Sequence, residues 1–584
     1  MKDTWSLDIL YHDFDDKSWK EDLNLLEKEI EAFNHFTEEL GRKKELDTLK
    51  EGVLFLEKIY GLSTQMIIFA NLKQTADTLD SKSASAIGIV SQLSNKATVA
   101  KTKFAKYISN IKNLDVIIKE DALLQEYEYF LHNIQKDDKY MLNEQVEEAL
   151  AKMDLSGGLA WGDLQSYLTS TVNVPYAGKN ITLSEVRNLA YDANQKVRKE
   201  AYEAELACYD SIKDSIAYAL NSIKMQDLTE CELRGFSSPL NKTLYYARME
   251  RKTLDALLEA MREYMPSFQS YLKTKAKALG HKNGLPWYEL FAPMGKIEKT
   301  YTIEEAKDYL IHVFSSFSKD IADTIVKAFE KEWIDFYPRK GKVGGAFCES
   351  LNTKKEFRIL TNFSGSFSDI VTLAHELGHG YHDCMVQDNR ILNMDYSMPV
   401  AETASTFNEN VITNYAIDHA KNDDEKLALI EGQLSDVTQI MCDIYSRFLF
   451  ESKVVENRNE KFMPADTLCD FMIEAQKEAY GDGLDSNHLH PFMWVCKGHY
   501  YSAQLGFYNY PYAFGGLFAR GLYAKYKKEG QIFIDKYNEM LKSTPVMSVE
   551  EVAKICDIDL TSKDFWLLSL HSYDEAIQTF QKLV

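Results

Sequence analysis

The segment that most constrains this chain is residues 373–379, which read L-A-H-E-L-G-H. His375 and His379 are four residues apart, so on a helix with 3.6 residues per turn their imidazoles project from one face. Glu376 follows the first histidine directly and stands beside that face. An H-E-x-x-H helix is typical of zinc sites in which both histidines bind one metal ion and the glutamate reaches a metal-bound water.

The flanking residues favour a helix at this position. Ser366 with Asp369 three residues later forms a capping-box pattern, and an apolar stripe at helical spacing follows, made of Ile370, Leu373, Ala374 and Leu377. A helix is required, because only a helix turns the i, i+4 pair into a chelate. The alternative is a chance motif, two solvent-facing histidines on a surface helix, and the capping box and apolar stripe argue against it.

A catalytic zinc site needs three protein ligands and one open position. Ser397 before Pro399 predicts a helix start, because proline is tolerated in the first turn and not later. On that helix Glu402 and Glu409 are seven residues apart and project from nearly the same face. We predict that Glu402 is the third ligand and that Glu409 receives an N–H from a ligating histidine. The alternative is a pair of exposed carboxylates on a solvated face.

The spacing after the second histidine excludes one class of zinc peptidase. The pattern H-E-x-x-H-x-x-G-x-x-H requires glycine at 382 and histidine at 385, whereas this chain has His382 and Met385. We therefore interpret His382 and Asp383 as structural or peripheral residues.

Three motifs together carry a family resemblance. N-F-S-G at 362–365, T-L-A-H-E-L-G-H at 372–379 and A-E-T-A-S-T-F-N-E at 401–409 resemble oligoendopeptidase F, in the thimet-oligopeptidase-like group of zinc metallopeptidases. The resemblance extends over most of the chain, and it implies that Glu402 is a zinc ligand, in agreement with the spacing. It also implies a mainly α, zincin-type fold with two helical lobes around a deep substrate channel and a small β-sheet beside the metal helix.

The resemblance implies a second catalytic segment near the C-terminus, where a histidine and several tyrosines face the zinc. The matching residues are His499, Tyr508, Tyr510 and Tyr512. Peptide hydrolysis builds negative charge on the carbonyl oxygen, and phenol or imidazole donors stabilise that charge. The alternative for any one tyrosine is a place in a buried aromatic seam.

This C-terminal segment departs from the family pattern F-Y-V-Y-Q-Y. The chain has Asn509 and Pro511 inside the pattern, and Gly498 where a proline usually precedes the histidine. Which of the three tyrosines contacts the oxyanion therefore stays open. Pro511 predicts a helix start, where the positive end of the helix dipole also favours an oxyanion.

Residues 341–348 and 358–363 predict two short strands before the metal helix, in a chain that is otherwise helical. In the family such a strand lines the cleft and can pair with the backbone of an extended peptide. We predict that Gly344, Gly345, Ala346 and Phe347 bind substrate, since the glycines leave room for close backbone approach. The alternative is a small structural sheet without substrate contact.

Composition predicts a large helical protein. The chain has 584 residues with only 11 Pro and 27 Gly, and long amphipathic runs cover residues 19–40 and 182–228. Its length exceeds that of a single ordinary domain. The turn-rich stretch 173–180 is the best boundary, which predicts an N-terminal helical lobe at 1–180 and a catalytic domain at 181–584.

Charge and cysteine usage limit the partners and the compartment. The 67 basic and 89 acidic residues leave a net charge of −22, which argues against nucleic acid. The N-terminus lacks a signal-peptide pattern, and we find no uninterrupted apolar run of membrane-spanning length. Eight scattered cysteines are typical of free thiols in a reducing compartment. We expect a soluble cytoplasmic monomer that binds short peptides and neither nucleic acid nor membranes.

These patterns together predict a zinc-dependent endopeptidase that hydrolyses short unstructured oligopeptides. One Zn²⁺ per chain would be held by His375, His379 and Glu402, while Glu376 takes a proton from the attacking water. Two alternatives stay open. A helical zinc carboxypeptidase would need a basic group for the substrate's terminal carboxylate. A non-catalytic peptide-binding protein could keep zinc for structure, although it would have no use for Glu376.

Overall fold

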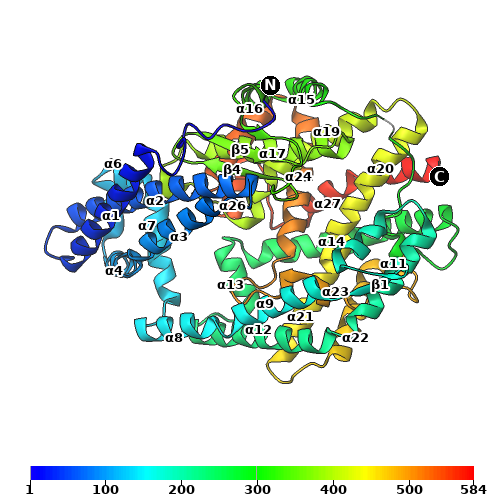
Figure 1. The fold of residues 1–584 in the computed structure, drawn as a ribbon, viewed down its shortest axis with the longest axis horizontal. Coiled ribbons are helices and arrows are strands. Elements are labelled where there is room, and N and C mark those ends of the chain that lie inside the picture. Colours follow the sequence, from blue (N-terminus) through cyan, green and yellow to red (C-terminus); the bar gives the residue numbers. More distant parts are fainter. Residues whose placement is uncertain (1, 298) are drawn as a thin grey trace. The chain divides into compact units, whose positions relative to one another are not determined.

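The computed structural model describes residues 2–297 and 299–584 and consists mainly of helices (Figure 1). Contacts between residues divide the chain into two compact units, each assembled from three stretches of sequence. The first unit contains Met1–Met141, Lys299–Ile412 and Tyr526–Asp557, and the second contains Leu142–Glu298, Thr413–Lys525 and Ile558–Val584. The boundary expected at residue 180 was drawn from turn residues in the sequence, whereas the two units are defined by contacts. The boundary at residue 180 stays a prediction.

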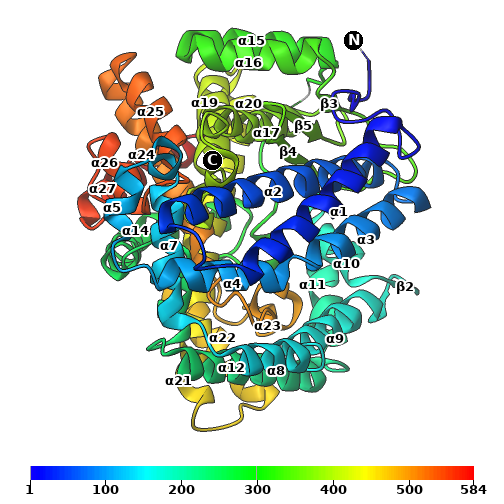
Figure 2. The ribbon, with the colours of Figure 1, turned by 90° about the vertical axis from the view of Figure 1, so that its left-hand side faces the viewer.

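The first unit combines an N-terminal group of helices with the segment that carries the H-E-x-x-H motif. Its helices are α1 (Lys17–Glu38), α2 (Glu45–Ala76), α3 (Ser81–Asn95), α4 (Thr98–Ser109), α5 (Leu114–Lys119), α6 (Ala122–Glu126), α7 (Glu128–Asp137), α15 (Ile303–Phe317), α16 (Lys319–Glu330), α17 (Phe367–Val386), α18 (Met398–Ala401), the first residues of α19 (Thr403–Asp418), α25 (Ile532–Ser543) and α26 (Val549–Ile555). Helices α15 and α16 lie side by side at one end of this unit (Figure 2).

Helix α2 is the longest helix of the first unit. Among the described residues it alone is long and apolar enough to cross a membrane by length and composition. It packs against α1 and α3, and Tyr60, Thr64 and Ile67 on this helix line the cavity described below. Within the protein, 33% of its most apolar stretch is buried.

A three-stranded sheet packs against α17, the helix that carries the H-E-x-x-H motif. The strands are β3 (Ile334–Asp335), β4 (Phe347–Leu351) and β5 (Glu356–Leu360), in the order β3-β5-β4. Strand β3 is parallel to β5, whereas β4 is antiparallel to β5 and, among the residues that the structure describes, has no partner strand on its other side. The two predicted strands exist, but their predicted bounds were wrong. Residues 341–346 are not extended, because Gly341 and Gly345 adopt φ angles of 89° and 78°.

Helix α17 begins as its sequence predicts. Ser366 caps the N-terminus, and the reciprocal bonds of a capping box join it to Asp369. The helix packs on β5 at Gly380, where an added Cβ would lie 2.6 Å from the ring of Phe357. Glycine at this position therefore allows the metal helix to lie close against the sheet.

The second unit is almost entirely helical. Its elements are α8 (Glu144–Asp154), α9 (Gly158–Thr171), β1 (Val174–Tyr176), β2 (Lys179–Ile181), α10 (Leu183–Asn188), α11 (Gln195–Tyr209), α12 (Lys213–Arg234), α13 (Pro239–Tyr246), α14 (Arg251–Ala278), α20 (Asp423–Thr438), α21 (Ile444–Arg458), α22 (Ala465–Tyr480), α23 (Met493–Cys496), most of α24 (Tyr510–Glu529), α27 (Lys563–His571) and α28 (Asp574–Leu583). The turn-rich stretch 173–180 forms most of the hairpin β1–β2, with Ala177 and Gly178 at φ angles of 48° and 77°.

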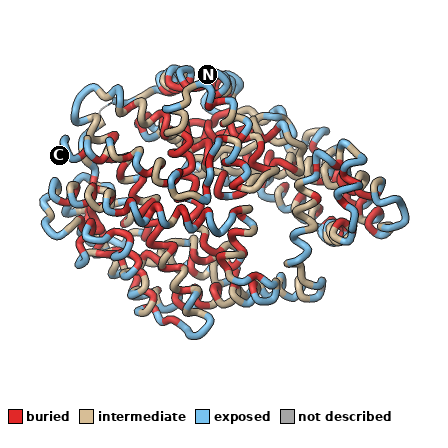
Figure 3. The backbone as a smooth tube through the Cα atoms, turned by 180° about the vertical axis from the view of Figure 1, so that it is seen from behind, coloured by how far each residue is buried: buried red, intermediate tan, exposed pale blue. Residues whose placement is uncertain are grey.

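Buried positions recur along the helices of both units and mark their cores (Figure 3). In the first unit, Leu26, Phe33, Val53, Phe69 and Phe104 belong to one apolar cluster built from α1, α2 and α4. The predicted amphipathic runs at 19–40 and 182–228 are helical over most of their lengths, since α1 covers the first and α10 to α12 cover the second.

Candidate metal centre and active site

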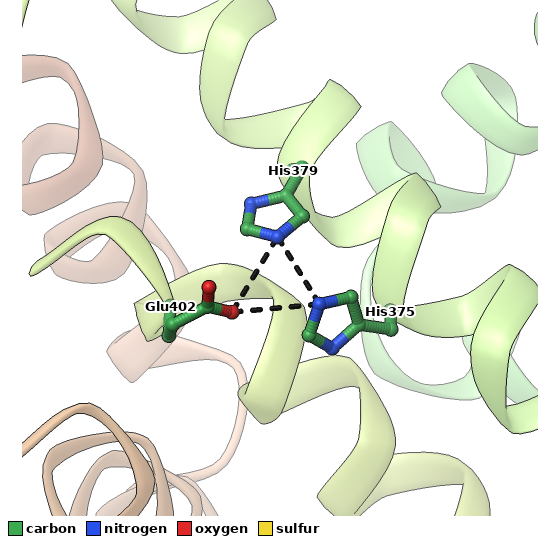
Figure 4. Close-up of side chains that lie close together, drawn as sticks. All are labelled: His375, His379 and Glu402. Atoms are coloured by element: carbon green, nitrogen blue, oxygen red, sulfur yellow. Dashed lines mark hydrogen bonds and ion pairs between the residues drawn. The ribbon is translucent and has the colours of Figure 1, made fainter. Parts of the chain in front are cut away.

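The side chains of His375, His379 and Glu402 point toward one another (Figure 4). His375 Nε2 lies 3.1 Å from His379 Nε2, and each of these nitrogens lies 3.4 Å from Glu402 Oε2. One ligand atom from each residue falls within 4.8 Å of the other two. Two imidazole nitrogens and a carboxylate oxygen are the donor types found in catalytic zinc sites, so this group fits a metal ion.

A break between two helices presents Glu402. Ser397 precedes α18, which ends at Ala401, and α19 begins at Thr403. Glu402 therefore lies at the junction rather than inside the continuous helix that its spacing to Glu409 assumed. The hydroxyl of Ser405 donates to Glu402 Oε2 at 2.8 Å and orients the carboxylate.

Close packing of α17 on α19 brings the three ligands together. A Cβ added to Gly378 would lie 2.6 Å from both the carbonyl oxygen of Ala404 and the Cα of Ser405. Only glycine permits this approach without a shift of one helix. Asn408 Nδ2 also donates to the carbonyl oxygen of Ala374 at 3.1 Å, which links the helices one turn away.

Glu409 supports the first histidine from behind. Its Oε1 lies 2.6 Å from His375 Nδ1. Although burial acts to lower the pKa of His375, the hydrogen bond and charge of Glu409 raise that pKa to about 9. A proton held on Nδ1 by this bond leaves the lone pair of Nε2 for a metal ion. The pKa of Glu402 falls to about 2, since its bonds to His379 and the charges of both histidines outweigh burial.

The ligands face a cavity of about 840 Å³ within the first unit. It is bordered by α2, by residues 346–350 and 352, by α17, and by residues 394–396. Glu376 lies on its wall with 6% of its surface exposed, and burial raises the pKa of this carboxyl. The cavity thus leaves space beside both the proposed ligands and Glu376.

The predicted substrate-binding stretch meets this cavity only in part. Ala346 and Phe347 line it, whereas Gly344 and Gly345 are not among its lining residues. A Cβ added at either glycine would have no atom within 4 Å. Close packing against another part of the protein is therefore not the reason for glycine at these two positions.

The cavity is also lined by three further acidic residues, of which sequence reasoning missed Glu349 and Asp395 and interpreted Asp383 as structural or peripheral. Glu349 on β4, Asp383 on α17 and Asp395 all line it, and none of its lining residues is Lys or Arg. Burial and the charge of Asp383 raise the pKa of Glu349 to about 7. In the sequence, only the alternation of side chains along β4 could have indicated that Glu349 faces the cavity. The placement of Glu349 beside residues of α17 depends on the fold.

His382 and Asp383 follow the proposed ligand His379 on α17, and of these two residues only Asp383 lines the cavity. His382 is fully buried, stacks on Tyr396 with ring centroids 4.2 Å apart, and contacts Thr544 Oγ1 at 2.8 Å. Burial lowers the pKa of His382 to about 3 and raises that of Asp383 to about 6. These contacts fit the structural role expected for His382.

In the second unit, His499 forms an aromatic cluster with two of the predicted tyrosines. Its ring stacks on Tyr508 at 5.3 Å and meets Tyr512 edge-on at 5.8 Å. Tyr512 Oη lies 3.5 Å from His499 Nε2. Burial, and then the charges of Arg447 and Lys497, lower the pKa of His499 to about 4, so the imidazole is neutral at neutral pH.

Tyr510 does not join this cluster. It is 1% exposed and starts α24, with Pro511 as the second residue of that helix. Tyr512 is 37% exposed. Two residues along a helix correspond to a rotation of about 200°, so the two side chains leave the helix on opposite sides. The structure thus groups Tyr508 and Tyr512 with His499 and places Tyr510 in the interior.

Two family profiles match the chain. The profile of Peptidase family M3 matches residues 188–572, and a second profile, Oligopeptidase F, matches residues 110–173. The first match covers more than half of the chain and includes every predicted ligand and catalytic residue.

Similar proteins cover the full length of the chain. Oligopeptidase PepF of Bacillus subtilis is 23% identical over 597 residues, which cover 100% of this chain and 87% of that protein. An oligoendopeptidase F homolog of Lactococcus lactis is 24% identical and covers 100% and 97%, respectively.

Solved structures share the fold. A crystal structure from Chlamydophila abortus, assigned as a peptidase, has a TM-score of 0.86 at 19% identity and covers 100% of this chain and 98% of that one. Oligoendopeptidase F from Enterococcus faecium has a TM-score of 0.72 at 17% identity, with 97% and 99% covered. The mainly α fold predicted from the sequence is confirmed. The chain therefore belongs to Peptidase family M3 and is a metallopeptidase that resembles oligoendopeptidase F.

Proposed function

We propose that the protein is a zinc-dependent endopeptidase that hydrolyses short, unstructured oligopeptides. The observation that carries this proposal is the group of His375, His379 and Glu402, whose ligand atoms lie within 4.8 Å of one another beside a cavity. Glu376 lies on the wall of the same cavity. A structural metal site would have no use for an open space and a carboxylate beside the ion.

One Zn²⁺ per chain would be held by these three residues. When bound, the ion supplies Lewis acidity toward the substrate carbonyl and makes water a stronger acid. Glu409 fixes the orientation of His375 through the 2.6 Å hydrogen bond. Glu376 accepts a proton from the attacking water at its carboxylate and passes that proton to the leaving amine.

The His499 segment would supply neutral hydrogen-bond donors for the carbonyl oxygen as it gains charge. The imidazole is neutral because burial lowers its pKa to about 4, and the phenols of Tyr508 and Tyr512 stand beside it. Neutral donors stabilise an oxyanion without competing for the metal. Tyr510 keeps its predicted place on this segment, yet its burial favours Tyr508 or Tyr512 as the donor.

Strand β4 offers a way to hold an extended peptide. It is an edge strand whose first residue, Phe347, lines the cavity together with Ala346. Free backbone groups at such an edge can pair with a peptide backbone and need little side-chain specificity. We therefore propose loose sequence preference, with contacts at positions 344–347 made mainly through the backbone.

One alternative activity is disfavoured by the cavity. A carboxypeptidase needs a cationic group for the terminal carboxylate of its substrate, and no lining residue of the cavity is Lys or Arg. We further propose a cytoplasmic location, which suits a chain whose eight cysteines form no disulfide among the described residues. A monomer without nucleic-acid or membrane partners stays our expectation.

A mass-spectrometric digest of a mixed peptide library, with and without chelator, tests the proposed function. We expect internal cleavage of peptides with free or amidated C-termini, loss of cleavage with chelator, and recovery when Zn²⁺ is added. Cleavage restricted to free C-termini would favour the carboxypeptidase. Zinc content of about one per chain without any cleavage would favour the binding protein.

Size selection is tested with one native globular protein and the short peptides made from it. We expect the peptides to be cleaved and the native protein to stay intact, because an extended strand requires unfolding at a cost of roughly 5–15 kcal/mol. Rapid chelator-sensitive cleavage of the native protein would overturn the size limit and leave the metal chemistry in place.

A further inference from the structure

A stripe of buried charge runs along α21 in the second unit. Asp443 directly precedes the helix, and Arg447 and Glu451 follow at intervals of four residues. They are 2%, 6% and 1% exposed, respectively. Four-residue spacing places all three near one face of the helix. Burying a charge costs folding free energy unless the charge is paired. The hydrogen-bond partners of these three residues therefore indicate what the stripe does.

The stripe binds the residues on both sides of Tyr508, the side chain of Asn509 and the backbone N–H of Phe507. Arg447 Nη2 is paired with Asp443, while Arg447 Nη1 donates to Asn509 Oδ1 at 3.2 Å. One turn later, Glu451 Oε1 accepts the backbone N–H of Phe507 at 2.9 Å. Residues 507 and 509 are thus both anchored to α21, and Tyr508 lies between them.

The anchored backbone is strained. Phe507 has a φ angle of 55°, in the left-handed region that a bulky residue rarely adopts. Such conformations cost on the order of 1–3 kcal/mol and persist where the surroundings determine them. Here the hydrogen bond from Phe507 to Glu451, itself paired with Lys224 at 2.6 Å, is one such determinant.

A π-helical turn sets the direction of the stripe. Residues Gln439–Asp443 form this turn between α20 and α21. One extra residue in a helix rotates everything that follows by about 100°, so an uninterrupted α-helix would turn the stripe away from residues 507–509. Single π-turns are frequent at functional sites.

The network around Tyr508 is incompletely paired. Arg447 Nε, Asn509 Nδ2 and His499 Nδ1 are buried, and none has a hydrogen-bond partner among the described residues. The bonds that this network does make hold the residues on both sides of Tyr508.

We propose that Arg447 is a positioning residue that holds Tyr508, and through the stacked ring His499, by its bond to Asn509. Glu451 anchors the other side of Tyr508 by accepting the backbone N–H of Phe507. This inference rests on the proposed function, in which the His499 cluster acts on the substrate. Asn509 is a departure from the family pattern, so the contact is a property of this chain and does not follow from the resemblance.

The test compares two replacements of Asn509. Asn509→Leu keeps the approximate volume but removes the acceptor, and we expect kcat and kcat/KM to fall together by about 10-fold through misplacement of the cluster. KM and zinc content should stay within about twofold of wild type. Asn509→Asp retains an acceptor for Arg447 and should restore kcat to within about threefold of wild type.

Asn221→Leu is the matched control. Asn221 is a buried asparagine of the same unit, 1% exposed, that bonds to the backbone of Ala217 and Met463. We expect this variant to lose thermal stability and to keep the wild-type kcat. An equal loss of kcat in Asn221→Leu and Asn509→Leu would reduce the effect to general destabilisation and overturn the inference.

A double-mutant cycle checks the route of the effect. Arg447→Lys keeps the charge beside Asp443 but lacks the planar fork that reaches Asn509. If Arg447 acts through Asn509, the double variant should lose no more turnover than the worse single variant. Fully multiplicative losses, or wild-type kcat in both single variants, would overturn the inference.

His499→Ala separates this failure from failure of the proposed function. Wild-type turnover in His499→Ala would show that the segment does no chemistry, which overturns both. Impaired His499→Ala together with fully active Asn509 and Arg447 variants would overturn only the positioning inference.

Discussion

The proposed ligand group and the His499 cluster are held in place by different means. His375 and His379 stand on α17, and Glu402 stands at the junction of α18 and α19, close to where α17 and α19 touch through Gly378. The cluster stands on irregular backbone that includes the left-handed Phe507 and is anchored by the charged stripe of α21. Helical periodicity thus builds the first region, whereas long-range hydrogen bonds build the second.

This difference has an energetic consequence. His375 and His379 stand one turn apart on a single helix, and loss of one ligand from a catalytic metal site removes the metal. A loop held by separate hydrogen bonds loses only about 0.5–3 kcal/mol with each bond, the larger values being for charged partners. Replacing a proposed ligand should therefore abolish activity nearly completely. Replacing a residue that anchors the His499 cluster should lower activity only in part.

The largest effect is expected at Glu376. Glu376→Gln removes the proton acceptor but spares the ligands, so turnover should fall by roughly 10²- to 10⁴-fold with zinc still bound. His375→Ala and Glu402→Ala should lose zinc itself. Peptide assays combined with metal analysis of the purified proteins separate the two outcomes. A nearly active Glu376→Gln enzyme would refute its role as the base.

His499→Ala tests the second region. If the cluster acts on the developing oxyanion, kcat and kcat/KM should fall together by roughly 10²- to 10³-fold, the size seen when one donor is lost. Zinc content should not change, because no residue of the cluster is a proposed ligand. A rise in KM alone, with kcat preserved, would show that the segment binds substrate without chemistry.

Gly378→Ala probes the close helix contact that assembles the ligands. Its Cβ would meet the backbone of Ala404 and Ser405 at 2.6 Å, so the helices must shift and zinc affinity should fall by roughly 10- to 100-fold. Competition with a chelator measures this affinity. Gly88→Ala on α3, where nothing lies within 4 Å, is the control and should leave zinc binding unchanged. Equal affinities in both variants would show that the contact does not position Glu402.

The same contrast explains how much could be predicted from the sequence. The i, i+4 histidines, the capping box at Ser366 and the helix start at Ser397 are local patterns, and the structure contains all of them. The break at Glu402 left no local signal, because its reason is the packing of α17 on α19. The partners of residues 507 and 509 lie 56 and 62 positions away on α21, so no local pattern could predict them.

The ends of the strands also could not be predicted from local sequence. The apolar and small residues around position 345 predicted extended backbone, yet Gly345 adopts a positive φ and β4 begins at Phe347. Lys342 explains the bend, since its buried ammonium donates to the carbonyl oxygens of Asp335, Tyr337 and Thr361. These acceptors gather only after the sheet forms, so the sequence alone could not have shown the bend.

The smallest expected effect concerns a carboxylate in each of the two regions. On α21 the buried Glu451 is paired with Lys224, whereas Glu349 on the cavity wall has no ion pair among the described residues. Burial and the charge of Asp383 raise the pKa of Glu349 from 4.5 to about 7. Its ionisation therefore opposes folding as the pH rises, unlike that of a paired carboxylate.

Glu349→Gln should remove this penalty. Between pH 4.5 and 7 the unfolded chain releases the Glu349 proton while the folded protein retains it, so the folded state binds more protons and its stability falls with rising pH. The penalty is complete above pH 7. At pH 8 the variant should therefore unfold at higher urea, by on the order of 1–2 kcal/mol after allowance for partial exposure. At pH 4 the two proteins should be equally stable, because Glu349 is then protonated in both states. A gain of the same size at both pH values would show that packing, rather than the unpaired charge, distinguishes the glutamine variant.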